Sequence, residues 1–134
     1  MSKLYKAQTR FLFHSDIKLK IPVEFDDLYS ILEEVNEKYN SYSENSYISK
    51  INKNSGRFVE VNDETIEILE KVIYYSDKLN GEYDITIMPL IKLWGFYKKN
   101  HQKIPLKEEI AEIKKLVNYK NIQIDKKNKR VKIE

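Results

Sequence analysis

At 134 residues, the chain has room for one domain with a modest hydrophobic core. Apolar residues make up 41% and charged residues 34%, which is ordinary for a globular protein and too apolar for a disordered one. The net charge of +3 is mild, and lysines alternate with acids along the chain, so nucleic-acid binding is not expected.

The sequence also excludes several classes of protein. No run of about eighteen apolar residues occurs, so a membrane-spanning helix is excluded. The absence of cysteine excludes disulfides and thiolate chemistry. The first ten residues carry no apolar stretch after their basic residues, so no secretory signal is visible. We expect a cytoplasmic protein, or a membrane-associated one if the natural start has been trimmed.

The first predicted element is a strand. Residues 10–23 alternate strictly in polarity, which predicts one long strand with a single buried face. That face would carry Phe11, Phe13, Ser15, Ile17, Leu19, Ile21 and Val23. From residue 26 the apolar spacing becomes helical, which predicts an amphipathic helix over 26–39.

The middle of the chain is predicted to be helical with short interruptions. Small polar residues at 40–46 indicate a turn, and a short helix is expected over 47–53. A brief strand at 57–61 precedes Asn62, a predicted N-cap with acids in the following turn. The helix that begins there runs to about Leu79 and ends at Asn80 and Gly81.

The last third begins with an irregular apolar segment at 81–96. Pro105 is predicted to open a helix at its first position, and 121–134 to form a hairpin whose second strand leaves an open sheet edge. The order of strand, helices and closing hairpin has no βαβ rhythm. The predicted fold class is therefore α+β, with a mixed or antiparallel sheet and packed helices.

Common catalytic signatures are missing, and we predict no catalytic residue and no metal ligand in this chain. The three glycines are far apart, so no phosphate loop exists. The two histidines, His14 and His101, have no partner at metal-binding spacing. His14 is expected to be structural or solvent-exposed, and His101 to be solvated.

Two segments have the composition of a binding site. Residues 40–49 form a polar loop with tyrosines, which is equally consistent with a connection between helices. Residues 81–86 combine a glycine turn, an aromatic ring and a carboxylate, and lead into Leu93-Trp94-Gly95-Phe96. Such a segment suits an aromatic ligand with polar edges, although an irregular core segment has the same composition.

Together these segments resemble the ApbE family of FAD:protein FMN transferases. The family pattern of a tyrosine followed by S-x-I-S-x-I-N is matched at 41–52. Its Gly-x-Phe-Asp-x-Thr is matched by Gly81-Glu82-Tyr83-Asp84-Ile85-Thr86, and its P-L-x-x-L-W-G-F by residues 89–96. The order and spacing span nearly the whole chain, which makes the combination specific.

The resemblance implies a T-fold-like half domain that binds FAD. It places Tyr42, together with Glu82, Tyr83 and Asp84, at the flavin. Phe13 is implied as a further contact, because Phe13-His14-Ser15 is the best match to the family's Met-Gly-Thr turn. The glycine of that turn is replaced here by His14, which would hinder a close backbone approach to the ligand.

The resemblance further implies an incomplete active site. Family members transfer FMN from FAD to a threonine or serine hydroxyl of a target flavoprotein and use magnesium. The family's Gly-Gly-x-x-Lys-Gly segment and its Mg²⁺ site belong to the second half of the pattern, whereas residues 1–134 match the amino-terminal half. Because phosphoryl transfer depends on positioning and on cations, we expect this chain alone to be inactive.

Two alternatives stay open. One is a catalytically silent module that binds flavin without transferring it. The other is an interaction domain that forms a homodimer by strand addition through the hairpin edge at 121–134. FAD affinity in the chain alone would favour the first, and a tight dimer that ignores flavin would favour the second.

Overall fold

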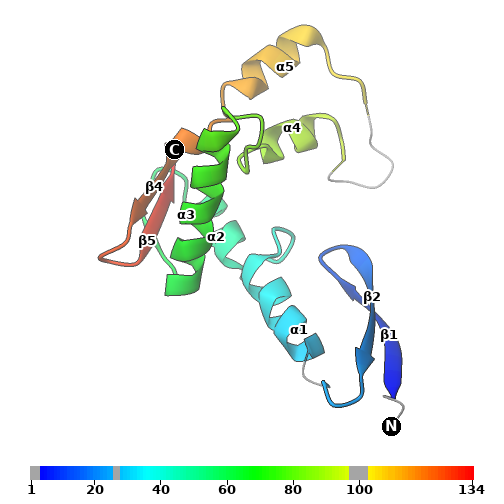
Figure 1. Ribbon diagram of the computed structural model, residues 1–134. Helices are drawn as coiled ribbons and strands as arrows, with labels where there is room; N and C mark the ends of the chain where they lie inside the picture. The colour runs from blue at the N-terminus through cyan, green and yellow to red at the C-terminus, as the bar shows by residue number, and fades with distance from the viewer. Residues whose placement is uncertain (1–3, 26–27, 97–102) are drawn as a thin grey trace. The chain divides into compact units, whose positions relative to one another are not determined.

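A computed structural model describes residues 4–25, 28–96 and 103–134 of the chain. The first two residues of the helix predicted at 26–39, and His101, lie outside these ranges. The chain divides into two compact units, Met1–Asn54 and Ser55–Glu134 (Figure 1). Each unit combines helices with antiparallel strands, which confirms the α+β class.

The first unit opens with a β-hairpin. Strand β1 (Tyr5–Leu12) pairs antiparallel with β2 (Ser15–Pro22), in a register that places Leu12 opposite Ser15. The prediction of one long strand over 10–23 is therefore wrong, because the chain reverses within it. The two turn residues, Phe13 and His14, have φ angles of 52° and 59°. Positive φ at both central positions is the geometry of a tight turn that matches the twist of the two strands.

The reversal also changes which side chains are buried. Across a two-residue turn the inner face passes from even positions in β1 to odd positions in β2. Leu12 and Ile21 are therefore buried, with Leu19 half-buried beside them. Phe11 and Phe13, predicted to lie on the buried face, are 66% and 38% exposed.

Helix α1 (Leu28–Tyr39) packs against this hairpin. The Tyr29 phenol, buried at 2% exposure, donates to the Gln8 carbonyl oxygen at 2.6 Å. Arg10 pairs with Glu33, and its guanidinium lies 4.5 Å from the centre of the Tyr29 ring. Helix α2 (Tyr47–Lys53) follows the polar loop and confirms the helix predicted at 47–53.

The second unit contains a three-stranded antiparallel sheet in the order β3-β5-β4. Its strands are β3 (Val59–Glu60), β4 (Ile122–Asp125) and β5 (Arg130–Ile133). The predicted hairpin is confirmed, but its second strand is the central one, since β3 pairs with it. The expected open edge on that strand is therefore wrong. Of the two hairpin strands, β4 is the one at the sheet's edge.

Helix α3 (Asp63–Lys78) contributes two side chains to the core of this unit. Asn62 caps it as predicted, because its side-chain oxygen accepts from the Thr65 amide at 2.9 Å. Ile66 and Leu69 are buried on its inner face. Two ion pairs, Lys126–Glu70 and Lys129–Asp63, join the hairpin turn to the exposed face of the helix.

The described residues of this unit also form the short helices α4 (Met88–Leu93) and α5 (Lys107–Lys114) and the 3₁₀ turn η1 (Tyr119–Asn121). Pro105 does not open α5 at its first position, because Leu106 is the extended N-cap residue. The Glu109 carboxylate, in the first turn of α5, accepts from the Leu106 amide at 2.8 Å. This hydrogen bond fixes the start of the helix at Leu106. In the part of the chain that the structure describes, no helix is long and apolar enough to cross a membrane.

Candidate flavin-binding residues

The 81–86 loop begins where α3 ends. Asn80 and Gly81 both have left-handed φ angles, of 51° and 80°. The Gly81 amide donates to the Ser76 carbonyl at 2.9 Å, and the Asn80 amide donates to the Asp77 carbonyl at 3.2 Å. This is a Schellman ending, in which two otherwise unpaired helix carbonyls are satisfied by the residues that follow. The loop therefore leaves the helix in one defined direction.

The carboxylate of Asp84 fixes the other end of this loop. Its Oδ1 accepts from the Thr86 amide at 2.8 Å and from the Thr86 hydroxyl at 2.6 Å. Its Oδ2 accepts from the Tyr119 amide at 2.9 Å, and the Thr86 hydroxyl oxygen in turn accepts from the Asn118 amide at 2.9 Å. We call these four residues, Asp84, Thr86, Asn118 and Tyr119, the Asp84 bracket.

Tyr119 joins the Asp84 bracket to the end of α3. Its side chain is buried, and the phenol donates to Asp77 Oδ1 at 2.6 Å. This hydrogen bond, together with burial and the charges of Asp77 and Asp84, raises the pKa of Tyr119 above its ordinary value. The ring also lies beneath the turn, because a Cβ built on Gly81 would be 3.7 Å from Tyr119 Cε1.

Glu82 and Tyr83 lie between these two fixed points and are exposed, Tyr83 at 44%. The Glu82 amide donates to the Leu79 carbonyl at 3.0 Å, so the glutamate side chain extends from an ordered backbone. The structure thus brings the three predicted flavin residues of this loop together. Their surroundings differ: Glu82 and Tyr83 are exposed, whereas Asp84 is half-buried and its carboxylate accepts hydrogen bonds from Thr86 and Tyr119.

The other two predicted residues, Phe13 and Tyr42, belong to the first unit. The Phe13 amide donates to Asn36 Oδ1 at 2.8 Å, which attaches the β1–β2 turn to α1. The ring of His14 lies 3.7 Å from the ring of Tyr42, centre to centre. Tyr42 is 41% exposed, and its amide donates to Asn40 Oδ1 at 2.9 Å. The turn therefore places the His14 ring against Tyr42, and Phe13, the other turn residue, is 38% exposed.

His14 is the residue that sequence reasoning undervalued here. As expected it is exposed, but it also contacts Tyr42 directly. The resemblance predicted His14 at the glycine of the family's turn, and His14 has a left-handed φ of 59°, a conformation that glycine tolerates without steric cost. The predicted match of His14 to a glycine was the available signal, because a glycine in a turn motif often marks a positive φ angle.

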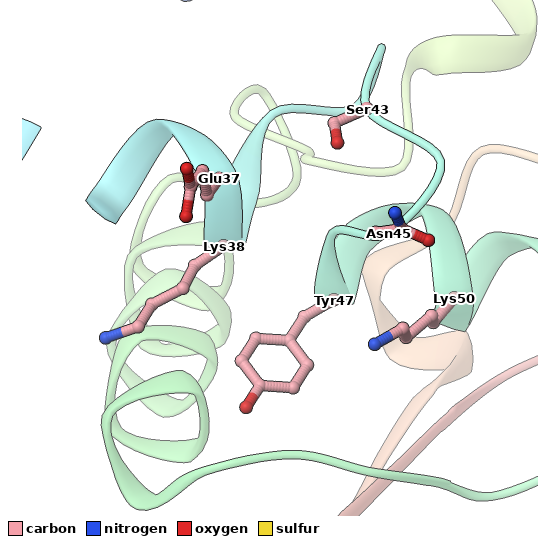
Figure 2. A pocket seen from close by; sticks show the side chains of 6 residues that line it. All are labelled: Glu37, Lys38, Ser43, Asn45, Tyr47 and Lys50. Carbon is pink, nitrogen blue, oxygen red and sulfur yellow. The ribbon is translucent and has the colours of Figure 1, made fainter. Parts of the chain in front are cut away.

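A hollow of about 510 Å³ lies elsewhere in the first unit, and Figure 2 shows the side chains that line it. Its lining residues are Glu37, Lys38, Ser43, Asn45, Tyr47 and Lys50. Lys38 pairs with Glu34 at 2.6 Å, and the Lys50 ammonium lies 5.8 Å from the centre of the Tyr47 ring. The charges are mixed, and none of the predicted flavin residues lines the hollow. Its chemistry favours no particular ligand.

The side chains also bear on metal binding. Within residues 4–25, 28–96 and 103–134, no group of three or more histidine, aspartate or glutamate side chains could hold a metal ion. The described residues therefore contain no cage of protein carboxylates and imidazoles for a metal ion.

Comparison with known proteins defines the class. The chain belongs to the ApbE family, whose family model matches residues 8–134. This result confirms the family that the tyrosine segment and the 81–96 segment indicate.

Relatives with known names agree with this assignment. A FAD:protein FMN transferase of Haemophilus influenzae is 29% identical over 103 residues, which are 75% of this chain and 30% of that protein. A FAD:protein FMN transferase of Vibrio cholerae is 27% identical over 97 residues, covering 71% of this chain and 29% of that protein. The crystal structure of the ApbE protein from Thermotoga maritima matches with a TM-score of 0.87 and 25% identity, covering 97% of this chain and 45% of that one. The chain thus matches less than half of each relative's length.

Proposed function

We propose that this chain is the FAD-binding part of a FAD:protein FMN transferase. The observation that carries the proposal is the family match over residues 8–134. The names of the Haemophilus and Vibrio relatives support it. The proposed partners are FAD and a flavoprotein with an acceptor threonine or serine, and the proposed location is the cytoplasm.

The proposed reaction is a phosphoryl-type transfer. The acceptor hydroxyl attacks the FMN-side phosphorus of FAD and loses its proton. A new phosphoester bond forms, the bond between that phosphorus and the bridging oxygen of the diphosphate breaks, and AMP leaves. Such a reaction depends on placing the two reactants and on neutralising the developing charge. The part of this chain is to bind FAD.

The residues that we propose as flavin contacts are Phe13, Tyr42, Glu82, Tyr83 and Asp84. The exposed rings of Phe13, Tyr42 and Tyr83 offer apolar faces to a flat aromatic ligand. Glu82 is exposed, so its carboxylate can turn to solvent and away from the FAD diphosphate. Asp84 fits a role through its backbone, since its two carboxylate oxygens accept hydrogen bonds from Thr86 and Tyr119.

Magnesium enters the proposal only as an ion bound by residues outside the described part of this chain. The described residues contain no group of three or more histidine, aspartate or glutamate side chains around one point, and no step of the reaction is assigned to the ion. From this we propose that residues 1–134 are the amino-terminal part of the transferase domain and are inactive alone. The chemistry then requires a phosphate-binding and metal-binding segment from the rest of the protein.

The first test is to read the coding sequence beyond the codon for Glu134. We expect further coding sequence that contains a Lys-Gly segment and a late aspartate or threonine metal site. A stop codon directly after Glu134 would contradict the transferase proposal for this protein.

The second test is a transfer assay. The complete gene product is incubated with FAD, Mg²⁺ and an acceptor flavoprotein, and covalent FMN on the acceptor is measured by mass spectrometry. Residues 1–134 alone serve as the comparison. We expect transfer by the complete protein and none by the 134-residue chain. FAD binding without transfer by the complete protein would instead favour the silent flavin-binding module.

A further inference from the structure

We propose that Thr86 and Tyr119 are positioning residues, which hold the exposed Glu82–Tyr83 segment in the conformation that binds flavin. This inference rests on the proposed function, because it concerns the same ligand. Neither residue is itself a proposed flavin contact. Their effect on FAD would be transmitted through Asp84 and through the end of α3.

The first step concerns the direction of the Asp84 carboxylate. Oδ1 accepts from the amide and the hydroxyl of Thr86, and Oδ2 accepts from the amide of Tyr119, all at 2.6–2.9 Å. Hydrogen bonds to an ionised acceptor are the stronger class, so a ligand would have to displace well-formed bonds to reach this carboxylate. The carboxylate therefore fixes the loop, and its backbone is what remains to face a ligand.

The second step concerns Thr86. Its side chain is 7% exposed, and its hydroxyl both donates to Asp84 Oδ1 and accepts from the Asn118 amide at 2.9 Å. One hydroxyl thereby links two segments that are 32 residues apart in sequence. Valine has the shape of threonine without the hydroxyl, so a valine here would break both bonds and leave the Asn118 amide without its acceptor.

The third step concerns Tyr119. Its amide is bound by Asp84, its phenol by Asp77 of α3, and its ring lies 3.7 Å from the Cβ position of Gly81. Tyr119 thus holds both ends of the loop. Its side chain contacts the end of α3 and Gly81, and its amide bonds to Asp84. Glu82 and Tyr83 are the residues between those ends. Rigid placement of a binding segment raises affinity, because less conformational freedom is lost when the ligand binds.

The protein offers a matched control in Thr65. This threonine is also buried, at 1% exposure, and its hydroxyl also donates to a side chain a few residues earlier, Asn62, at 2.5 Å. It lies at the opposite end of α3 from the 81–86 loop. Thr65→Val should therefore reduce stability without changing the conformation of the loop.

The experiment uses the complete gene product with FAD as the probe. Thr86→Val, Thr86→Ser, Thr65→Val and wild type are compared by FAD titration and by amide hydrogen exchange of residues 82–86. We expect Thr86→Val to raise the Kd for FAD about tenfold, the equivalent of losing one well-placed hydrogen bond. It should also speed exchange at Glu82 and Tyr83. Thr86→Ser keeps the hydroxyl and should restore both values, and Thr65→Val should lower Tm with an unchanged Kd.

Each outcome decides a different point. If wild type does not bind FAD, the proposed function is wrong, while hydrogen exchange still tests whether Thr86 and Tyr119 order the loop. If Thr86→Val leaves both the Kd and the exchange unchanged, the positioning role is wrong. An equal loss of FAD affinity in Thr65→Val would show that the change in Kd follows from lower overall stability. That result would also overturn the positioning role of Thr86.

A second variant covers the case in which Thr86→Val does not fold. Tyr119→Phe keeps the ring beneath Gly81 and the amide bond to Asp84, and removes only the phenol contact with Asp77. We expect its Kd for FAD to rise about threefold, a smaller change because one of the two attachments is kept. Wild-type affinity and exchange in Tyr119→Phe would exclude Tyr119 from the positioning role.

Discussion

The two regions that carry the predicted flavin residues are built differently. In the second unit, the 81–86 loop is held by a half-buried carboxylate that accepts three hydrogen bonds and by a buried tyrosine beneath the turn. In the first unit, Phe13 and Tyr42 are exposed side chains, and Tyr42 lies against the ring of His14, which shares a tight turn with Phe13. That turn is attached to α1 by the hydrogen bond from the Phe13 amide to Asn36.

The difference shows that the residues predicted to contact flavin have two kinds of surroundings. Around Asp84, the side chains of Asp84 and Thr86 form hydrogen bonds within the protein, and these bonds fix the backbone of the loop. Around Tyr42, aromatic faces are exposed, and the backbone turn has left-handed φ angles at residues other than glycine. We therefore expect substitutions that remove the hydrogen bonds of Asp84 to reduce stability strongly. Substitutions of Phe13 and Tyr42 are expected to affect ligand binding more than stability.

The largest expected effect is that of Asp84→Ala. Removing the carboxylate leaves the Thr86 hydroxyl and the Thr86 and Tyr119 amides without their acceptor, so the free energy of unfolding should fall by about 3 kcal/mol. Urea denaturation measures this change. The neighbouring exposed Glu82→Ala is the matched control and should stay within about 0.5 kcal/mol of wild type. Equal effects of the two substitutions would show that the hydrogen bonds of the Asp84 carboxylate do not hold this loop.

A smaller effect of opposite sign is expected at the β1–β2 turn. Replacing Phe13-His14 by Asn-Gly supplies the residues that this turn type prefers, at positions with φ of 52° and 59°. Relief of the left-handed strain, less the loss of the His14–Tyr42 contact, should stabilise the protein by about 1 kcal/mol. Thermal unfolding measures the gain, and an FAD titration should show weaker binding. The single substitution Phe13→Ala separates the ring from the turn geometry, and unchanged FAD affinity in this variant would exclude Phe13 as a flavin contact.

The third prediction concerns pH. The hydrogen bond to Asp77 raises the pKa of Tyr119, so the folded state holds the phenolic proton more tightly than the unfolded chain does. The resulting stability is fully present below the ordinary tyrosine pKa of about 10, and is lost as the pH rises through the higher folded pKa. The stability difference between wild type and Tyr119→Phe should therefore be constant from about pH 7 to 9 and shrink above pH 10. Denaturation at a series of pH values measures it, and a constant difference would contradict it.

The smallest expected change in stability is that of Tyr42→Ala. The side chain is 41% exposed, so the free energy of unfolding should change by no more than about 0.5 kcal/mol. If its ring stacks on the flavin, FAD affinity should nevertheless fall roughly fivefold. Lys50→Gln, in the hollow of the same unit, is the control and should bind FAD as wild type does. A loss of stability without a loss of affinity would assign Tyr42 to packing.

The sequence by itself determined the elements that depend on local signals. The Asn62 cap and apolar spacing predicted α3, the 47–53 segment predicted α2, and alternation around a polar turn predicted the β4–β5 hairpin. Asn80 and Gly81 predicted where α3 ends. The motifs at 41–52 and 81–96 were sufficient to indicate the family. Each of these signals lies within one turn, one helix or one short motif.

The tertiary structure decided what depends on distant partners. Strict alternation over 10–23 cannot reveal a reversal at Phe13-His14, because a tight turn needs only two residues and neither is glycine or asparagine. Nor can spacing show that β3 pairs with β5. The direction of the Asp84 carboxylate was likewise decided by Tyr119, 35 residues further along the chain. A charged side chain bonds to whichever donors the fold brings near it, and only the packed chain defines those donors.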